Sequence, residues 1–325
     1  MIEVAAGIDV GGTTTKFGLV TKEGKVVSKK RISTDSSVEF NEFFQDLFRR
    51  ISDLMNQNGT EYSLAGFGIG APTGNCFTGN IDNASNLSWK GKIPIVRLTE
   101  DYFKLPAFLA NDANAAALGE MIFGAARGMK NFAVITMGTG LGCGLVANGD
   151  LLTGHNGHAA EIGHSTVFYD GRLCSCGLKG CLETYVSGFG LLRTLREIAE
   201  RSDKQGITWD AINNTNLTAI DITNAALRGD QQAIETFNYT GKILGMKLAD
   251  LVTYFDPEAI ILLGGLAKAD SLILKPARKE MEKNLLDIYQ NKVKLIVSEM
   301  NNDDAGILGA AATAWNGLNC KPELR

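Results

Sequence analysis

One short region of the chain gathers side chains that bind transition metals. It contains His164, Cys174, Cys176 and Cys181, with the spacing H-x9-C-x-C-x4-C. One imidazole and three thiolates form the ligand set of a closed, tetrahedral structural zinc site. Two glycines between the last two cysteines would supply the tight turns that a metal knuckle requires. The residue types and their spacing therefore predict a zinc ion held by these four residues.

Two other interpretations of the cysteines are open from the residues themselves. A cysteine is often a small buried core residue, and two cysteines can form a disulfide. Cys76, Cys143 and Cys320 are scattered along the chain, and no secretory signal opens it. Zinc is therefore favoured over a disulfide and over plain core packing.

Two loops rich in glycine and threonine have the composition of phosphate-binding loops. The first offers freed backbone N–H groups, hydroxyls and a lysine at Gly11, Gly12, Thr13, Thr14 and Lys16. The second offers the same chemistry without a lysine at Gly138, Thr139 and Gly140. One such loop is also a common hairpin turn, but two matching loops could hold a polyphosphate from both sides. Neither fits the G-x-G-x-x-G or G-x-x-x-x-G-K-[ST] pattern, which disfavours a Rossmann dehydrogenase and a P-loop enzyme.

Two further positions carry both a structural and a functional interpretation. Asn111 and Asp112 stand where a short strand turns into a helix, so either could be an N-cap. Alternatively, Asp112 is a general base and Asn111 holds a substrate hydroxyl. Gly264 and Gly265 follow an apolar strand, where α/β folds place ligands such as an adenine or a ribose. A simple strand-to-helix turn would explain this glycine pair equally well.

Strands and helices alternate along the chain, which predicts an α/β fold. The expected strands lie at 4–10, 16–20, 25–29, 64–70, 107–110, 259–263 and 292–297, with a strand–loop–strand unit at 132–152. The expected helices lie at about 38–58, 113–126, 186–202, 218–228, 230–255, 274–289 and 304–316. The 132–152 unit repeats the pattern of the first hairpin, since Gly12-Thr13 matches Gly138-Thr139. We therefore expect two related halves, each opening with a hairpin that bears a Gly/Thr loop.

The bulk composition excludes several classes of protein. A chain of 325 residues predicts two domains. Its net charge of −4 argues against nucleic acid or an anionic membrane as a partner. No run approaches the eighteen apolar residues of a membrane span. A cytoplasmic location is the resulting expectation.

Together these residues resemble the ROK family (repressors, open reading frames, kinases), in its bacterial glucokinase-like branch. The resemblance runs from residue 7 to about residue 313. The matching motifs are Asp9-Val-Gly-Gly-Thr, Gly-Ile-Gly-Ala-Pro at 68–72, Asn86-Leu, Asn111-Asp112-Ala-Asn-Ala-Ala, Gly138-Thr-Gly-Leu-Gly-Cys-Gly, Glu161-Ile-Gly-His164 and Cys174-x-Cys-Gly-x-x-Gly-Cys181-x-Glu183.

The resemblance implies the actin-like (ribonuclease-H-like) ATPase fold, with two α/β domains flanking a cleft. The smaller domain would comprise 1–115 and the C-terminal helix at about 304–318, and the larger domain 116–303. The implied activity is an ATP-dependent sugar kinase that uses Mg²⁺, contains structural Zn²⁺ and forms a homodimer. The cysteine cluster favours ATP over polyphosphate as the donor.

The resemblance also implies roles for individual residues. Asp112 is similar to the family's catalytic base, and Asp9 to the carboxylate near Mg²⁺. The sugar contacts would be Gly74, Asn75, Asn86, Asn111, Asp112, Glu161, His164 and Glu183. The phosphate contacts would come from the two Gly/Thr loops, and the nucleoside contacts from Gly264 and Gly265. His164 would both bind zinc and face the sugar.

Glucose is the first candidate substrate, phosphorylated on its 6-hydroxyl, because Glu161, His164 and Glu183 suit several equatorial hydroxyls. N-acetylmannosamine, N-acetylglucosamine, mannose, fructose and allose stay open as alternatives. Two residues depart from the family pattern: Leu266 follows the glycine pair where a third glycine is common, and Thr73 follows Pro72. A non-catalytic sugar sensor is the alternative of another class. A DNA-binding repressor is disfavoured, because Asp9 leaves no room for an N-terminal helix-turn-helix.

Overall fold

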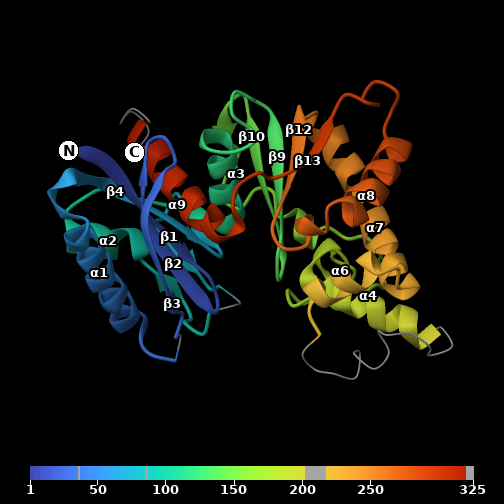
Figure 1. The fold of residues 1–325 in the computed structure, drawn as a ribbon, viewed down its shortest axis with the longest axis horizontal. Coiled ribbons are helices and arrows are strands. Elements are labelled where there is room, and N and C mark those ends of the chain that lie inside the picture. The colour runs from blue at the N-terminus through green and yellow to red at the C-terminus, as the bar shows by residue number, and fades with distance from the viewer. Residues whose placement is uncertain (36, 85–86, 202–216, 320–325) are drawn as a thin grey trace. The chain divides into compact units, whose positions relative to one another are not determined.

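The computed structural model describes residues 1–35, 37–84, 87–201 and 217–319. The chain forms two compact units, each built on its own mixed sheet (Figure 1). Unit 1 comprises Met1–Met129, Asp150–Ala159 and Glu299–Arg325, and unit 2 comprises Lys130–Gly149 and Ala160–Ser298.

The sheet of unit 1 has the strand order β3-β2-β1-β4-β8. Its strands are β1 (Ile2–Val10), β2 (Thr14–Thr21), β3 (Val26–Ser33), β4 (Tyr62–Ala71) and β8 (Ala107–Asn111). The hairpin strands β1, β2 and β3 pair antiparallel, whereas β4 and β8 continue the sheet in parallel. The central strand β1 is buried from Val4 to Ile8, as expected for a strand covered on both faces.

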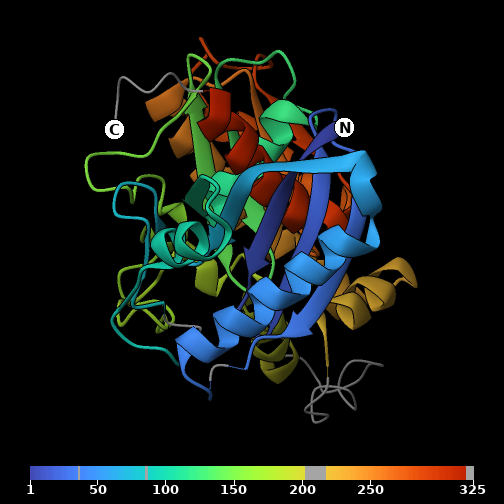
Figure 2. The same cartoon turned by 90° about the vertical axis from the view of Figure 1, so that its left-hand side faces the viewer.

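Helices cover both faces of this sheet. They are α1 (Phe40–Gln57), α2 (Ile95–Phe103), α3 (Asp112–Ile122) and α9 (Asn302–Asn319), with a 3-10 turn η1 (Gly59–Glu61). The predicted apolar face of α1 is buried, including Phe44, Leu47 and Ile51. Figure 2 shows α1 crossing one face of the sheet, while α9 lies on the opposite face. A small sheet of β5 (Gly74–Asn75), β6 (Asn80–Asp82) and β7 (Lys92–Ile93) completes unit 1.

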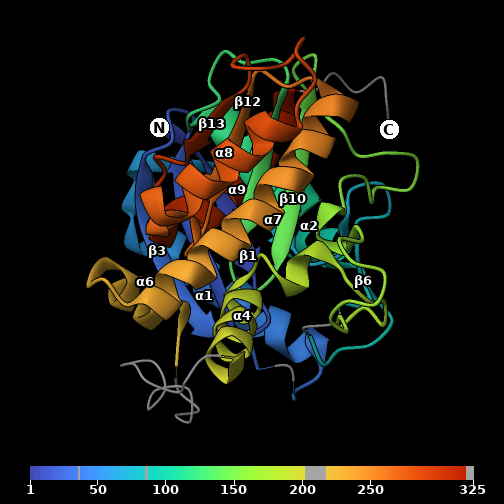
Figure 3. The ribbon, with the colours of Figure 1, turned by 90° about the vertical axis from the view of Figure 1, so that its right-hand side faces the viewer.

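The second sheet has the order β11-β10-β9-β12-β13. Its strands are β9 (Phe132–Met137), β10 (Leu141–Ala147), β11 (Asp150–Leu151), β12 (Ala259–Leu263) and β13 (Lys294–Val297). The helices of unit 2 are α4 (Gly188–Arg201), α6 (Ala219–Leu227), α7 (Gln231–Phe255) and α8 (Ser271–Asn284), with 3-10 turns η2 (Ile162–His164), η3 (Leu182–Thr184) and η4 (Ala267–Ala269). Figure 3 shows α7 and α8 packed side by side.

The two sheets share one topology, which confirms the predicted duplication. In each sheet a central strand pairs antiparallel with the next strand of its hairpin and parallel with a later strand. The two Gly/Thr loops therefore occupy equivalent places, between β1 and β2 and between β9 and β10.

The structure departs from the predicted elements in several places. The helix predicted at 113–126 ends at Ile122, as α3, and the strand predicted at 25–29 extends to Ser33, as β3. The helix predicted at 274–289 begins earlier and ends earlier, as α8, because Asp270 has a left-handed φ of 45° and Leu285 is extended. The helix α2 and the small sheet were not predicted. Among the described helices, none is long and apolar enough to cross a bilayer.

Candidate active site and metal centre

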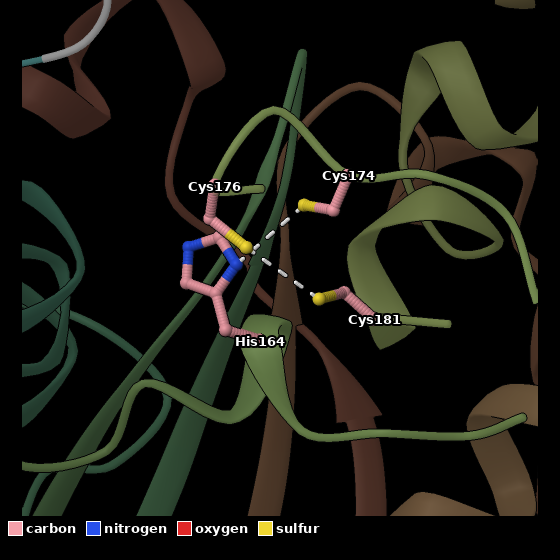
Figure 4. A group of neighbouring side chains, drawn as sticks. All are labelled: His164, Cys174, Cys176 and Cys181. Carbon is pink, nitrogen blue, oxygen red and sulfur yellow. Dashed lines mark hydrogen bonds between the residues drawn. The ribbon is translucent and has the colours of Figure 1, made fainter. Parts of the chain in front are cut away.

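The four predicted zinc ligands converge in unit 2 (Figure 4). Their ligand atoms all lie within 4.8 Å of one another. The Sγ atoms of Cys176 and Cys181 are 3.7 Å apart, and the Cys174 Sγ is 3.8 Å from the Nδ1 atom of His164. Two sulfurs bound to one tetrahedral zinc at about 2.3 Å would be separated by about 3.8 Å. The spacing of the side chains therefore fits a tetrahedral zinc ion.

The chemistry of the thiols supports the same interpretation. The five described cysteines are all free, so none of them forms a disulfide. Burial, and hydrogen bonds that its thiol donates to Cys176 and Cys174, raise the pKa of Cys181 to about 12. Burial raises the pKa of Cys176, but hydrogen bonds from the backbone of Leu178 and from the neighbouring cysteines lower it more. A bound zinc ion would deprotonate the thiols that bind it. The cluster is therefore compatible with structural zinc.

His164 is held in a defined orientation. It ends the 3-10 turn η2, and its Nδ1 atom faces Cys174. The preceding Ala160 has a φ of 71°, and its carbonyl accepts a hydrogen bond from the amide of Ile162 at 2.7 Å. Glu161 is exposed in this tight turn, and its carbonyl accepts a hydrogen bond from the amide of His164 at 3.1 Å. The turn therefore places Glu161 and His164 together.

Glu183 links the metal cluster to the second Gly/Thr loop. Its Oε2 atom accepts a hydrogen bond from the amide of Leu141 at 2.9 Å, and its Oε1 atom lies 3.9 Å from the Cys174 sulfur. A Cβ atom on Gly140 would lie 2.5 Å from Oε2, so a larger residue here would displace the Glu183 carboxylate. Gly138 and Thr139 remain exposed at the tip of the loop.

The glycine pair after β12 lies against the end of β9. Gly264 has a φ of 113°, and the amide of Leu266 donates to the carbonyl of Met137 at 3.2 Å. Since Met137 is followed directly by Gly138, the structure brings Gly264 and Gly265 next to the second loop.

Arg172 was not singled out from the sequence, and its side chain supports the segment that leads into the metal-binding cysteines. Arg172, with its side chain 4% exposed, donates two hydrogen bonds to Glu197, at 3.0 and 2.6 Å. It also donates to the carbonyls of Thr184 and Gly190, at 2.6 and 3.2 Å. Its guanidinium lies 4.3 Å from the ring centroid of Tyr185. Arg172 thereby ties the segment before Cys174 to η3 and α4.

In unit 1, Asp112 begins α3 immediately after the strand β8. Its Oδ1 atom accepts from the amide of Ala113 at 2.8 Å, and the Oδ1 atom of Asn111 accepts from the same amide at 2.9 Å. Asn111 is therefore the N-cap, and Asp112 is fixed by the first free amide of the helix. Asp112 keeps exposed surface, yet burial by the surrounding protein raises its pKa despite these hydrogen bonds.

A second carboxylate lies near Asp112 in unit 1. Burial, then repulsion from Asp112, raises the pKa of Asp9 to about 6, while the charge of Lys16 lowers it. Asp9 pairs with Lys16 across β1 and β2, just before the loop of Gly11, Gly12 and Thr13. Unit 1 thus brings together the predicted base, the predicted magnesium carboxylate and the first loop.

The remaining predicted sugar contacts lie around the small sheet. Asn75 is 5% exposed, and its side chain bonds to the amides of Phe77 and Thr78 and to the carbonyl of Asn156. Its Nδ2 atom also lies 3.4 Å from Nε2 of His158. Gly74 is buried beside it, after Thr73 with its left-handed φ of 51°. Asn86 lies outside the described residues.

Comparisons with known proteins settle the family. The ROK family model matches residues 5–316. The chain belongs to the ROK family. This ROK protein is 37% identical to the glucokinase of Halalkalibacterium halodurans over 309 residues, which cover 93% of this chain and 92% of that one. It is 28% identical to the xylose repressor of Bacillus subtilis, covering 92% of this chain and 74% of the repressor.

A solved structure extends the comparison to the fold. The ROK family glucokinase from Streptomyces griseus, in complex with glucose and AMPPNP, superposes with a TM-score of 0.79 at 32% identity. The match covers 95% of this chain and 98% of that one. ROK sugar kinases have the actin-like ATPase fold, so the predicted fold class is confirmed.

Proposed function

We propose that this ROK protein is an ATP-dependent glucokinase, which transfers the γ-phosphoryl group of ATP to the 6-hydroxyl of glucose. One observation carries the proposal: Asp112 presents a carboxylate of raised pKa at a helix N-terminus, near a second carboxylate at Asp9. The similarity to curated glucokinases over most of the chain supports glucose as the acceptor.

Asp112 would act as the general base. Its carboxylate takes the proton of the 6-hydroxyl while that oxygen attacks the γ-phosphorus. The bond to the β–γ bridging oxygen breaks, and ADP leaves. A raised pKa suits this role, because a base must hold the proton that it accepts. The hydrogen bond from Ala113 fixes one oxygen of Asp112, which orients the other.

The two loops would bind the phosphates of ATP through backbone amides and hydroxyls, with Lys16 adding positive charge to the first loop. Asp9 would hold Mg²⁺, which neutralises the charge that develops on the phosphates. Gly264 and Gly265 would lie along the nucleoside.

Asn111, Glu161, His164 and Glu183 would bind the sugar hydroxyls, with Gly74, Asn75 and Asn86 nearby. Because Nδ1 of His164 faces the cysteines, Nε2 is the nitrogen that would reach the sugar. A zinc ion on the four ligands would stabilise this ring in its orientation. A homodimer in the cytoplasm, where ATP is supplied, completes the proposal.

The test is phosphorylation by the purified protein of a panel of hexoses and N-acetylhexosamines with ATP, with Asp112→Asn alongside. Asp112→Asn should lower kcat about 10²–10⁴-fold, because the base is lost, while glucose binding by calorimetry stays intact. Asp101→Asn, on α2 and 67% exposed, is the matched control and should be fully active. Turnover of another sugar would correct the substrate. Sugar binding without any turnover would refute the kinase and favour a sensor.

A further inference from the structure

The helix α9 lies directly on the backbone of the first sheet. Gly7 of β1 pairs with Gly18 of β2 and with Gly68 of β4, so three glycines stand side by side across neighbouring strands. A Cβ atom on Gly7 would lie 2.9 Å from the amide nitrogen of Ala311, and a Cβ on Gly68 would lie 2.7 Å from that of Ala314. The glycines therefore leave no space between the sheet and α9 for an ordinary side chain.

Asp9 is two residues beyond Gly7 on the same strand. Since alternate residues of a strand point to the same face, Asp9 also faces α9. The residue that it meets there is Gly306. A Cβ atom on Gly306 would overlap the Oδ2 atom of Asp9 and lie 2.6 Å from its Cγ atom.

The backbone gives no reason for glycine at this position. Gly306 lies inside α9, where the left-handed region is not used. Glycine in a helix interior costs about 1 kcal/mol relative to alanine. The segment around it is otherwise rich in alanine, including Ala305 and Ala310. The missing side chain is therefore explained by the carboxylate that occupies its place.

We propose that Gly306 is a positioning residue for Asp9. Because Gly306 has no side chain, the Asp9 carboxylate can occupy the space beside α9, on the side of unit 1 where Asp112 lies. In the kinase, a methyl group at residue 306 would rotate or displace this carboxylate and so disturb the binding of ATP with Mg²⁺. This consequence rests on the proposed function. The steric contact between Gly306 and Asp9 does not.

A double-mutant cycle in thermal stability tests the contact without any activity measurement. Gly306→Ala should lower Tm in the wild-type protein, because the new methyl group overlaps Asp9. In the Asp9→Ala background the same change should lower Tm by less, because the overlap with Oδ2 and Cγ is gone and only the Cβ of residue 9, 3.2 Å away, remains. Asp9→Ala removes the Oδ2 and Cγ atoms that the new methyl group would overlap, and the charge that it leaves without its neighbour, Lys16, is only half-buried.

Gly309→Ala is the matched control in the same helix. Its Cβ would lie 2.7 Å from the carbonyl oxygen of Ala115, so its effect on Tm should be the same with or without Asp9. An equal loss of Tm from Gly306→Ala in both backgrounds, or no loss in either, would overturn the proposal.

Kinetics then separate positioning from simple packing. Gly306→Ala should lower kcat/KM for ATP about tenfold to a hundredfold, the loss expected for one contact to a charged group. The dissociation constant for glucose should be unchanged. Unchanged ATP kinetics in a folded Gly306→Ala protein would overturn the positioning role. If the wild-type protein phosphorylates no sugar but the Tm cycle behaves as expected, the proposed function fails and the positioning of Asp9 stands.

Discussion

Arg172 is not a predicted metal ligand, yet replacing it should destabilise the segment that carries the metal-binding cysteines. We consider Arg172→Met, which keeps much of the volume but removes every donor. The part-buried carbonyl of Thr184 then loses a hydrogen bond from a charged donor, at a cost of about 1–3 kcal/mol. The contact with Tyr185 adds about 2 kcal/mol when it is desolvated. Glu197 is 35% exposed and can be hydrated, so its share is small.

The sum is a loss of about 3–5 kcal/mol, which comes from the hydrogen bond to Thr184 and the contact with Tyr185. In a unit of this size, that loss corresponds to about 6–20 °C in Tm. Differential scanning calorimetry of zinc-loaded protein would measure the shift. Since Arg172 precedes Cys174 by two residues, zinc should also transfer faster to a chromogenic chelator.

Arg193→Met is the matched control, because Arg193 contacts the same Glu197 carboxylate at 3.4 Å but is 48% exposed. Its loss should cost no more than about 1 kcal/mol. Equal Tm values for the two variants, with equal rates of zinc transfer, would refute the view that burial makes Arg172 the support of the metal centre.

Three further predictions concern stability. Partial burial raises the pKa of Glu197, but Arg172 and its neighbours lower it more, so its folded pKa lies below its unfolded value. Its stabilising contribution is therefore present above about pH 4.5 and lost as the pH falls through the folded pKa. In urea titrations, the free energy of unfolding should therefore decrease less between neutral and acidic pH for Glu197→Gln than for the wild-type protein. Removal of zinc by a chelator should lower Tm and weaken glucose binding together, and a metal-free protein with unchanged values of both would exclude a structural zinc. Thr73→Asn should raise the free energy of unfolding by about 1 kcal/mol, because asparagine tolerates the φ of 51° better than a β-branched residue; a lower value in denaturant titrations would contradict this origin of strain.

Local patterns in the sequence predicted those elements whose signal is long or chemically specific. The helix α1 follows from its buried face of Phe44, Leu47 and Ile51, and β12 has the bounds that its apolar run predicted. The metal cluster follows from spacing, because its three cysteines lie within one short loop. The N-cap of Asn111 was also foreseen as one of two interpretations, and the structure combines it with a fixed Asp112.

What was missed depends on contacts between distant parts of the chain. The strands β5, β6 and β7 are two or three residues long, too short to show any periodicity. Arg172 looks like a surface residue until η3 and α4 surround it. The contact of Gly306 with Asp9 joins the two ends of the chain, so nothing in either local sequence indicates it.

The composition of unit 1 has a consequence for how the protein is made. Unit 2 lies almost entirely within one continuous stretch of chain, whereas unit 1 begins with the first residues and needs α9 from Asn302–Asn319. Domains commonly fold during synthesis in the order in which they emerge from the ribosome. Here the N-terminal sheet emerges first but must wait for the last helix to cover Gly7 and Gly68. Unit 2 can therefore complete its fold first, and the carboxylate of Asp9 reaches its final place only after α9 has been made.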